Sequence, residues 1–275
     1  MSFEQPKFGS TITKEKPWQE ERGYRKVTGC VEEYAKALIE KRFPIDKYGR
    51  LLEEKYSRVY SEKDLSMDIK LKEIRKEKFR EKKYESFKEV EASDKGESFE
   101  ILTIAILQKF LKKESFLVLR ASEYDDIKRG ADLLILDREK KEIICALDAS
   151  VSSKFNENKG DKFWNENDRF DGVEIKYGLI PAEGKSGKKV FKLGQARAPL
   201  LIFSVRPEEV ENAIDNFNTE VDNKIFDKFS EEMISQIGVL SRSETLSDER
   251  SRNRLSRFEK YLENYKKPRE VVGVK

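Results

Sequence analysis

The chain has 275 residues, of which 56 are basic and 53 acidic, so its formal net charge is only +3. Any attraction to nucleic acid must therefore come from local patches of charge. Hydrophobic residues make up 37% of the chain and charged residues 40%, which suits one core surrounded by solvated helices or arms. The chain has no histidine, which excludes Ser-His and Cys-His nucleophiles, histidine general bases and Cys/His zinc sites.

The two cysteines, Cys30 and Cys145, are too few and too far apart for a disulfide framework. Cys145 lies within an apolar run, which predicts a buried, reduced thiol. The first residues lack the apolar run of a signal peptide, and no apolar stretch approaches the length of a membrane span. We expect a soluble, cytoplasmic protein with no membrane partner.

The first third of the chain is polar and charged. Residues 1–30 are interrupted by proline and glycine and predict an irregular arm. Residues 31–92 predict a charged helical region, in which 30–43 form one amphipathic helix that ends at Pro44. Residues 68–89 hold nine basic and six acidic side chains. This composition fits a basic arm laid along phosphates, or a solvated helix face.

Residues 93–218 predict an α/β core that opens with a helix over 96–111. The spacing of Phe99 and Leu102 gives this helix an apolar face. Glu97 and Glu100 fall in the first turn of the predicted helix, where carboxylates stabilise the helix dipole. Glu100 also adjoins the apolar face, so it is a candidate site residue.

Apolar runs over 115–121, 131–136 and 142–147 predict three strands, of which the last two form a hairpin. Asp132 lies at the start of the first hairpin strand and Asp148 at the end of the second. Because these two ends meet in an antiparallel pair, we expect the two carboxylates to lie close together. They are either metal ligands or ordinary aspartates bonded to backbone amides at the strand ends.

The remaining segments complete a mixed sheet flanked by helices. In chain order they are a charged loop over 123–130, a partly helical segment over 153–169, a strand over 172–180 that carries Glu174 and Lys176, a short strand at 190–194, a buried strand over 198–205, a helix over 207–217, and a C-terminal helical region over 219–275. The fold class is therefore α/β, with helical extensions at both ends. The basic side of the last helix, at 247–266, packs onto the core or faces a polyanion.

The order helix, three strands, helix, strand resembles the core of the restriction-endonuclease-like superfamily, the PD-(D/E)xK nucleases. Phe99-Glu100 resembles the family's helix glutamate, and Gly130-Ala131-Asp132-Leu133 resembles its aspartate at the second strand. Asp148-Ala149-Ser150 stands where the family has an acid, any residue and a lysine. The resemblance covers about residues 94–205.

This resemblance implies a site for Mg²⁺ or Mn²⁺, since hard divalent ions prefer oxygen ligands. Asp132, Asp148 and Glu100 are the expected metal ligands, with the carbonyl of Ala149 as a further donor. Such an ion activates water and stabilises charge on a phosphate.

Ser150 departs from the family pattern because it carries no positive charge. Lys176, in the triplet Glu174-Ile175-Lys176, is one expected substitute, although a cross-strand ion pair is the plainer explanation of this residue. Lys154 and Lys159, at the entrance of the following helix, are the others.

Three functions fit the sequence. The first is a divalent-metal-dependent nuclease that acts on DNA or RNA, with catalysis by Glu100, Asp132, Asp148 and either Lys176 or Lys154. The second is a catalytically inactive module of the same fold that binds nucleic acid or a protein partner. The third is a structural protein that uses its charged helices as assembly surfaces. No dinucleotide fingerprint or P-loop supports a nucleotide cofactor.

Overall fold

The computed structural model of the chain describes residues 22–83, 87–152, 157–184, 187–242, 246 and 248–266. Most of the predicted arm and Lys154 lie outside these residues. The helices, in chain order, are α1 (Arg22–Glu40), the short 3₁₀ helix η2 (Glu53–Tyr56), α2 (Glu62–Lys83), α3 (Phe87–Phe110), α4 (Glu123–Arg129), α5 (Glu157–Phe170), α6 (Pro207–Asp215), α7 (Glu220–Arg242) and α8 (Glu249–Lys266). The strands are β1 (Phe116–Arg120), β2 (Leu133–Asp137), β3 (Glu142–Val151), β4 (Val173–Glu183), β5 (Lys189–Ala198) and β6 (Leu200–Val205).

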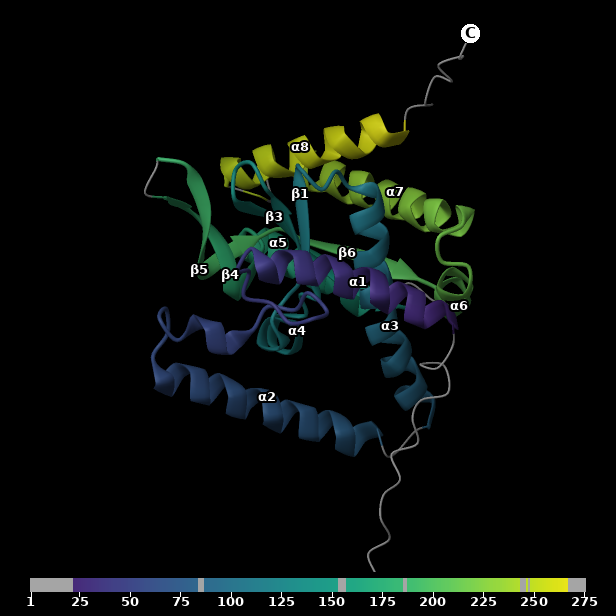
Figure 1. The fold of residues 1–275 in the computed structure, drawn as a ribbon, viewed down its shortest axis with the longest axis horizontal. Coiled ribbons are helices and arrows are strands. Elements are labelled where there is room, and N and C mark those ends of the chain that lie inside the picture. Colours follow the sequence, from purple (N-terminus) through teal and green to yellow (C-terminus); the bar gives the residue numbers. More distant parts are fainter. Residues whose placement is uncertain are drawn as a thin grey trace, which may run out of the picture.

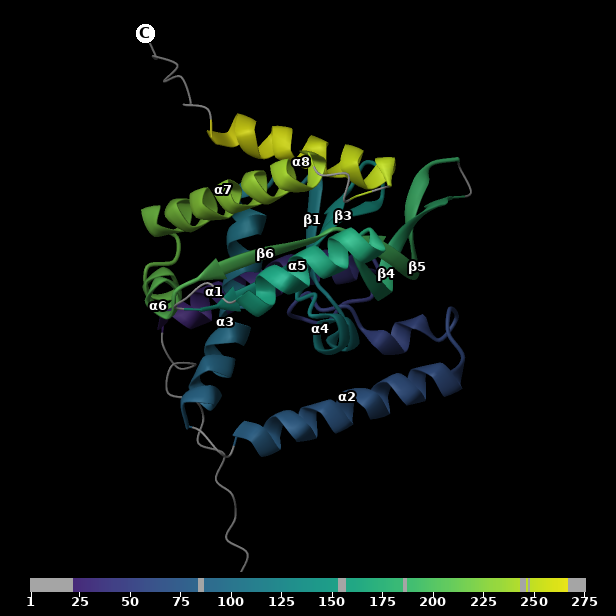
Figure 2. The ribbon, with the colours of Figure 1, turned by 180° about the vertical axis from the view of Figure 1, so that it is seen from behind.

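The central sheet has four strands in the order β1-β2-β3-β6. The first three strands pair antiparallel, whereas β3 and β6 run parallel. A parallel pair needs a crossover connection, and here it contains α5 and a separate two-stranded sheet, β4-β5. The predicted mixed α/β architecture, with helices flanking the sheet, is confirmed (Figures 1 and 2).

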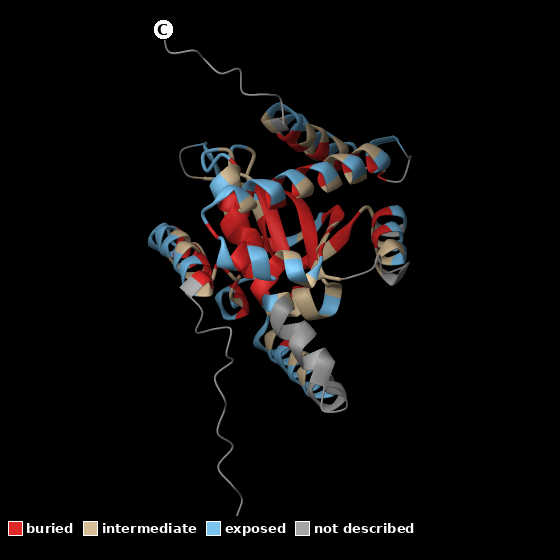
Figure 3. Cartoon of the chain, turned by 90° about the vertical axis from the view of Figure 1, so that its right-hand side faces the viewer, coloured by how far each residue is buried: buried red, intermediate tan, exposed pale blue. Residues whose placement is uncertain are grey.

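Both faces of the central sheet are buried (Figure 3), which explains why its strands are continuous apolar runs without an alternating pattern. Successive side chains of β1 and β2 point to opposite faces. Leu133 and Ile135 belong to the cluster packed by α3, α7 and α8, whereas Leu134 and Leu136 belong to a second cluster beneath α1 and the β4-β5 hairpin.

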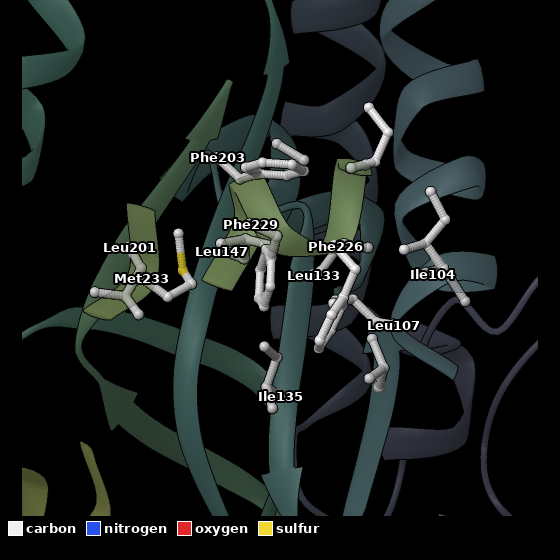
Figure 4. Packing of buried hydrophobic residues seen from close by; sticks show 14 of the residues in the cluster. Ile104, Leu107, Leu133, Ile135, Leu147, Leu201, Phe203, Phe226, Phe229 and Met233 are labelled. Carbon is white, nitrogen blue, oxygen red and sulfur yellow. The ribbon is translucent and has the colours of Figure 1, made fainter. Parts of the chain in front are cut away.

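Helix α3 fills the centre of the first cluster. Leu107 of α3 lies next to Phe226 of α7, beside Leu133 and Ile135 of the sheet (Figure 4). Residues of α1, α7 and α8 belong to this same cluster, so helices from both ends of the chain pack onto the core.

Two helices begin earlier than the sequence predicts. Helix α1 begins at Arg22, where Gly23 lets the helix approach the backbone of α6; a Cβ at Gly23 would collide with the carbonyl of Ile214. Helix α3 begins at Phe87 and passes through the predicted helix entry. Glu100 therefore lies in the helix interior, and a helix-dipole role for it is wrong.

Side chains cap the outer backbone of β6, the edge strand. The amide of Asn167, which is fully buried on α5, donates to the carbonyl of Leu200 at 2.8 Å and accepts from its N–H at 2.9 Å. Gln236 of α7 bonds the N–H and carbonyl of Ile202 in the same way, at 2.8 and 2.7 Å. These side chains supply the hydrogen bonds that a fifth strand would make.

The opposite edge, β1, is covered in a similar way. The Tyr34 hydroxyl accepts from the Val118 N–H at 3.3 Å, and the segment around Arg50 forms a parallel bridge with Arg120. Both edges of the sheet are therefore covered by other parts of the chain.

No described helix combines the length and the apolar character required to cross a membrane.

Replacing Asn167 with Leu keeps the branched arrangement of side-chain heavy atoms but leaves the buried N–H and carbonyl of Leu200 without partners. We expect Asn167→Leu to lower the free energy of unfolding by about 2–4 kcal/mol, measured by denaturant titration. The control is Asn223→Leu, at an exposed position of α7, with an expected change within about 0.5 kcal/mol. Equal effects of the two substitutions would contradict the capping role of Asn167.

Candidate metal centre

Three carboxylates from three elements meet at one end of the central sheet. Glu100 comes from α3, Asp126 from α4 and Asp132 from the residue just before β2. One carboxylate oxygen from each lies within 4.8 Å of the others. This separation is close enough for three oxygens to share a single cation.

Strand pairing places Asp132 beside the end of β3, where the sequence predicts it. Its N–H donates to the carbonyl of Leu147 at 2.9 Å, and its Oδ2 accepts from the N–H of Ala149 at 2.7 Å. The start of β2 and the end of β3 therefore lie side by side, and Asp132 adjoins the segment that carries Asp148.

Asp126 is a candidate ligand that the sequence reasoning missed. Residues 123–129 form the helix α4, so the prediction of a charged loop over 123–130 is wrong. The signals of a short helix were present. Ser122 is the N-cap and accepts from the N–H of Asp125 at 3.0 Å, while Gly130 ends the helix in the left-handed conformation at φ 63°. Acidic residues begin α4 and basic residues end it, as the helix dipole favours.

Asp125 anchors α4 to β4. Its carboxylate accepts from the backbone N–H groups of Lys176 and Tyr177 at 2.8 and 3.0 Å. Those two residues lie where the register between β4 and β5 shifts, so their N–H groups are directed to Asp125. Burial raises the pKa of Asp125 to about 6, although these N–H groups and Ser122 lower it. This anchor fixes the helix that carries Asp126.

Two arginines compensate part of the negative charge. Arg120 donates to Glu100 Oε2 at 2.6 Å, and Arg50 contacts Glu100 at 3.2 Å and Asp126 at 3.0 Å. The bridge between residues 50 and 120 brings the two arginines together. Burial nevertheless raises the pKa of Glu100, because the arginines offset it only in part and Asp126 adds to it.

Two lysines of α5 bind Asp148. Lys159 Nζ lies 2.5 Å from Oδ1 and Lys162 Nζ lies 2.6 Å from Oδ2, and Lys162 also donates to the carbonyl of Gly130 at 2.8 Å. Burial acts to raise the pKa of Asp148, but the two ammonium groups more than offset it and hold the pKa below its ordinary value. Asp148 is therefore an ionised partner of the two lysines and lies beside the three-carboxylate group. The sequence predicts Asp148 as the third member of that group, but the third carboxylate is that of Asp126.

Asp132 differs from its three acidic neighbours because, among the described residues, no cationic side chain contacts it. It is only 8% exposed, and its hydrogen-bond donor is the Ala149 N–H. Burial, together with the charges of Glu100, Asp126 and Asp148, raises its pKa well above the ordinary value. A buried carboxylate without a cationic partner is stabilised by binding a proton or a cation.

The sequence predicts Lys176 as a substitute for the missing lysine. Its ammonium group pairs with a carboxylate outside the three-carboxylate group. It pairs with Asp68 of α2 and lies 5.1 Å from the ring centre of Tyr60 and 5.2 Å from that of Tyr124. These contacts tie β4 to α2 and α4. The α5 lysines lie beside Asp148 instead; Lys159 was among the expected substitutes, whereas Lys162 was missed.

Ser150 faces the neighbouring strand. Its hydroxyl lies 2.7 Å from that of Ser204 on β6, across the parallel register of the two strands. Ser150 therefore takes part in a cross-strand hydrogen bond at the position where a lysine was expected.

The donor set fits a hard divalent cation. Glu100, Asp126 and Asp132 offer only carboxylate oxygens, the ligands that Mg²⁺ and Mn²⁺ prefer. The group could hold a metal, and nothing in its chemistry selects one of these two ions over the other.

Comparison of the chain with protein-family models, with curated proteins and with solved structures gives no match. The functional argument therefore depends on the geometry of this cluster.

Replacing Asp132 with Asn keeps the shape of the side chain and removes the charge. In EDTA, we expect Asp132→Asn to be at least as stable as the unsubstituted protein, because an amide needs no neutralising cation. With Mn²⁺ at about 100 times its Kd, the unsubstituted protein gains about 2.7 kcal/mol of stability, and the variant does not. Thermal unfolding with and without Mn²⁺ measures both effects.

The control is Asp215→Asn, at an exposed carboxylate of α6, which should keep the full response to Mn²⁺. If Asp132→Asn also kept that response, or were strongly destabilised in EDTA, Asp132 would be only a backbone acceptor at the strand end.

Proposed function

We propose that this protein is a divalent-metal-dependent nuclease that hydrolyses phosphodiester bonds in DNA or RNA. The observation that carries this proposal is the buried Asp132 carboxylate, which lacks a cationic partner among the described residues and lies with Glu100 and Asp126 in one group of oxygens. A Mg²⁺ or Mn²⁺ ion held by this group would activate water and stabilise charge on the scissile phosphate.

The arrangement of the elements supports the resemblance to the PD-(D/E)xK nucleases. The helix α3, the strands β1, β2 and β3, the helix α5 and the strand β6 follow the order expected of that core, with the β4-β5 hairpin inserted before β6. Glu100 lies in α3 and Asp148 in β3, and Asp132 directly precedes β2, after the additional helix α4. The shared order of elements is an argument from fold, and the chemistry of the cluster has to carry the function.

Lys159 and Lys162 are suited to the role of the lysine that Ser150 replaces. Both ammonium groups contact Asp148. The next residue, Ala149, donates its N–H to Asp132, so the two lysines lie beside the three-carboxylate group. Their side chains are 24% and 27% exposed, which leaves them accessible to a phosphate. In the proposed reaction they bind its non-bridging oxygens and stabilise the charge that develops there.

The proposed reaction is hydrolysis of a phosphodiester bond. The oxygen of water forms a bond to phosphorus, the bond from phosphorus to one ester oxygen breaks, and the leaving oxygen takes up a proton. Asp148 holds the two ammonium groups in position, and the arginines at Glu100 restrain the carboxylate ligands.

The catalytically inactive module remains the second candidate, and one observation favours it. Arg50, Arg120, Lys159 and Lys162 pair with Glu100, Asp126 and Asp148, so these three carboxylates have cationic partners without a metal ion. A protein of this kind would bind nucleic acid without cleaving it, or would bind a protein partner.

The test is cleavage of labelled DNA and RNA, single-stranded and duplex, in Mg²⁺ or Mn²⁺. We expect Asp132→Asn to abolish cleavage and Lys162→Met to lower kcat by about 10²- to 10⁴-fold, since a positioned lysine acts on the transition state. Lys128→Met, at an exposed lysine on α4, is the matched control and should retain activity.

Cleavage that persists in EDTA, or that Asp132→Asn leaves intact, would contradict the proposal. Saturable Mn²⁺ binding without cleavage of any of these substrates would favour the inactive module.

A further inference from the structure

A second charged feature lies at the opposite end of β3 from the carboxylates. It is a pocket of about 420 Å³ between the first turns of α8, the turn from β2 to β3 and the β4-β5 hairpin. We name it the basic pocket; its lining residues are Lys140, Glu142, Pro181, Lys189, Arg250, Asn253, Arg254 and Arg257.

The lining is strongly positive, with five basic residues and one acidic residue. They come from three separate parts of the chain, and the sequence as a whole is almost neutral. The helix α8 presents Arg250, Arg254 and Arg257 at spacings of four and three residues, which places them on one face. The basic side that the sequence predicts for this helix therefore faces a concave surface.

Some of these cations have structural partners. Arg254 donates to the carbonyl of Ile143 at 2.7 Å, and Arg257 lies 3.4 Å from Asp137. The Nε of Arg254 is buried and has no hydrogen-bond partner among the described residues. Arg254 is therefore held by the backbone of β3, whereas the Arg257 side chain is 47% exposed.

Lys189 and Arg250 differ from the other basic residues of the pocket in their partners. Both are exposed, and neither forms an ion pair within the described parts of the chain. Like charges held close together repel one another, so a bound anion would stabilise the arrangement. Phosphate is the anion class that such clusters of Lys and Arg bind best.

We propose that the basic pocket binds backbone phosphates of the nucleic acid on which the candidate metal centre acts. Glu142 begins β3 and Asp148 lies six residues further along, so the pocket and the carboxylates are about 20 Å apart along the strand. At about 3.4 Å per nucleotide step, this separation equals roughly six nucleotide steps of a nucleic acid. The choice of nucleic acid as the occupant rests on the proposed function. The expectation that the pocket binds phosphate rests only on its basic lining residues.

The experiment measures binding of a labelled 20-base-pair duplex and a 20-nucleotide single strand by fluorescence anisotropy in EDTA, as a function of salt. Binding in EDTA does not depend on the metal centre, so failure of the nuclease proposal leaves this result interpretable. We expect Lys189→Ala and Arg250→Ala each to weaken binding and to reduce the slope of log K against log salt by about 0.9, and the double variant by about 1.8.

Lys224→Ala removes an exposed lysine near the start of α7 and is the matched control, with no change in slope expected. Asp132→Asn should bind the duplex at least as well as the unsubstituted protein. Unchanged affinity and slope in the double variant would overturn the proposal, as would the absence of nucleic-acid binding by the unsubstituted protein. Inorganic phosphate is the second probe; if it bound at the pocket while the polymers did not, the occupant would be a small anion.

Discussion

The structure depends on the balance of charge around one buried carboxylate. Glu100, Asp126 and Asp148 each have an arginine or a lysine within hydrogen-bond distance, whereas Asp132 has only a backbone N–H. Removing four carboxylates from water would destabilise the fold strongly if they were left unpaired. Arg50, Arg120 and the lysines of α5 therefore stabilise the fold by pairing with three of these carboxylates. Asp132 is left as the carboxylate of the four without a cationic partner among the described residues, and the nuclease proposal depends on it.

The same cluster shows how the inserted elements serve the core. The β4-β5 hairpin lies outside the central sheet, yet the register shift in β4 turns two N–H groups toward Asp125. Asp125 fixes α4, and α4 carries Asp126 to the carboxylates. Lys176 strengthens this connection from the other side through Asp68 and the tyrosine rings. An insertion that appears peripheral in the topology thus sets the position of a candidate ligand.

Part of this could be predicted from the sequence. The approach of the Asp132 and Asp148 segments follows from antiparallel pairing, which is local and has a fixed geometry. Helix α4 was missed because it spans only 7 residues, all but two of them charged, although its caps were readable. The positions of Arg50 and Lys162 depend on packing between segments distant in sequence, which no local pattern encodes. Lys176 matched a short motif, but strand pairing directs its side chain toward α2; motif spacing alone does not determine direction.

The covering of the sheet edges has a consequence for how this protein can meet others. A bare edge strand is a template on which another chain can add a strand, in specific complexes and in aggregates alike. Asn167 and Gln236 occupy the outer hydrogen-bonding groups of Leu200 and Ile202 on β6, and Tyr34 and the segment around Arg50 cover β1. The width of the sheet is thereby fixed at four strands. At these capped positions a partner can contact side chains, but it cannot pair with the backbone as an added strand.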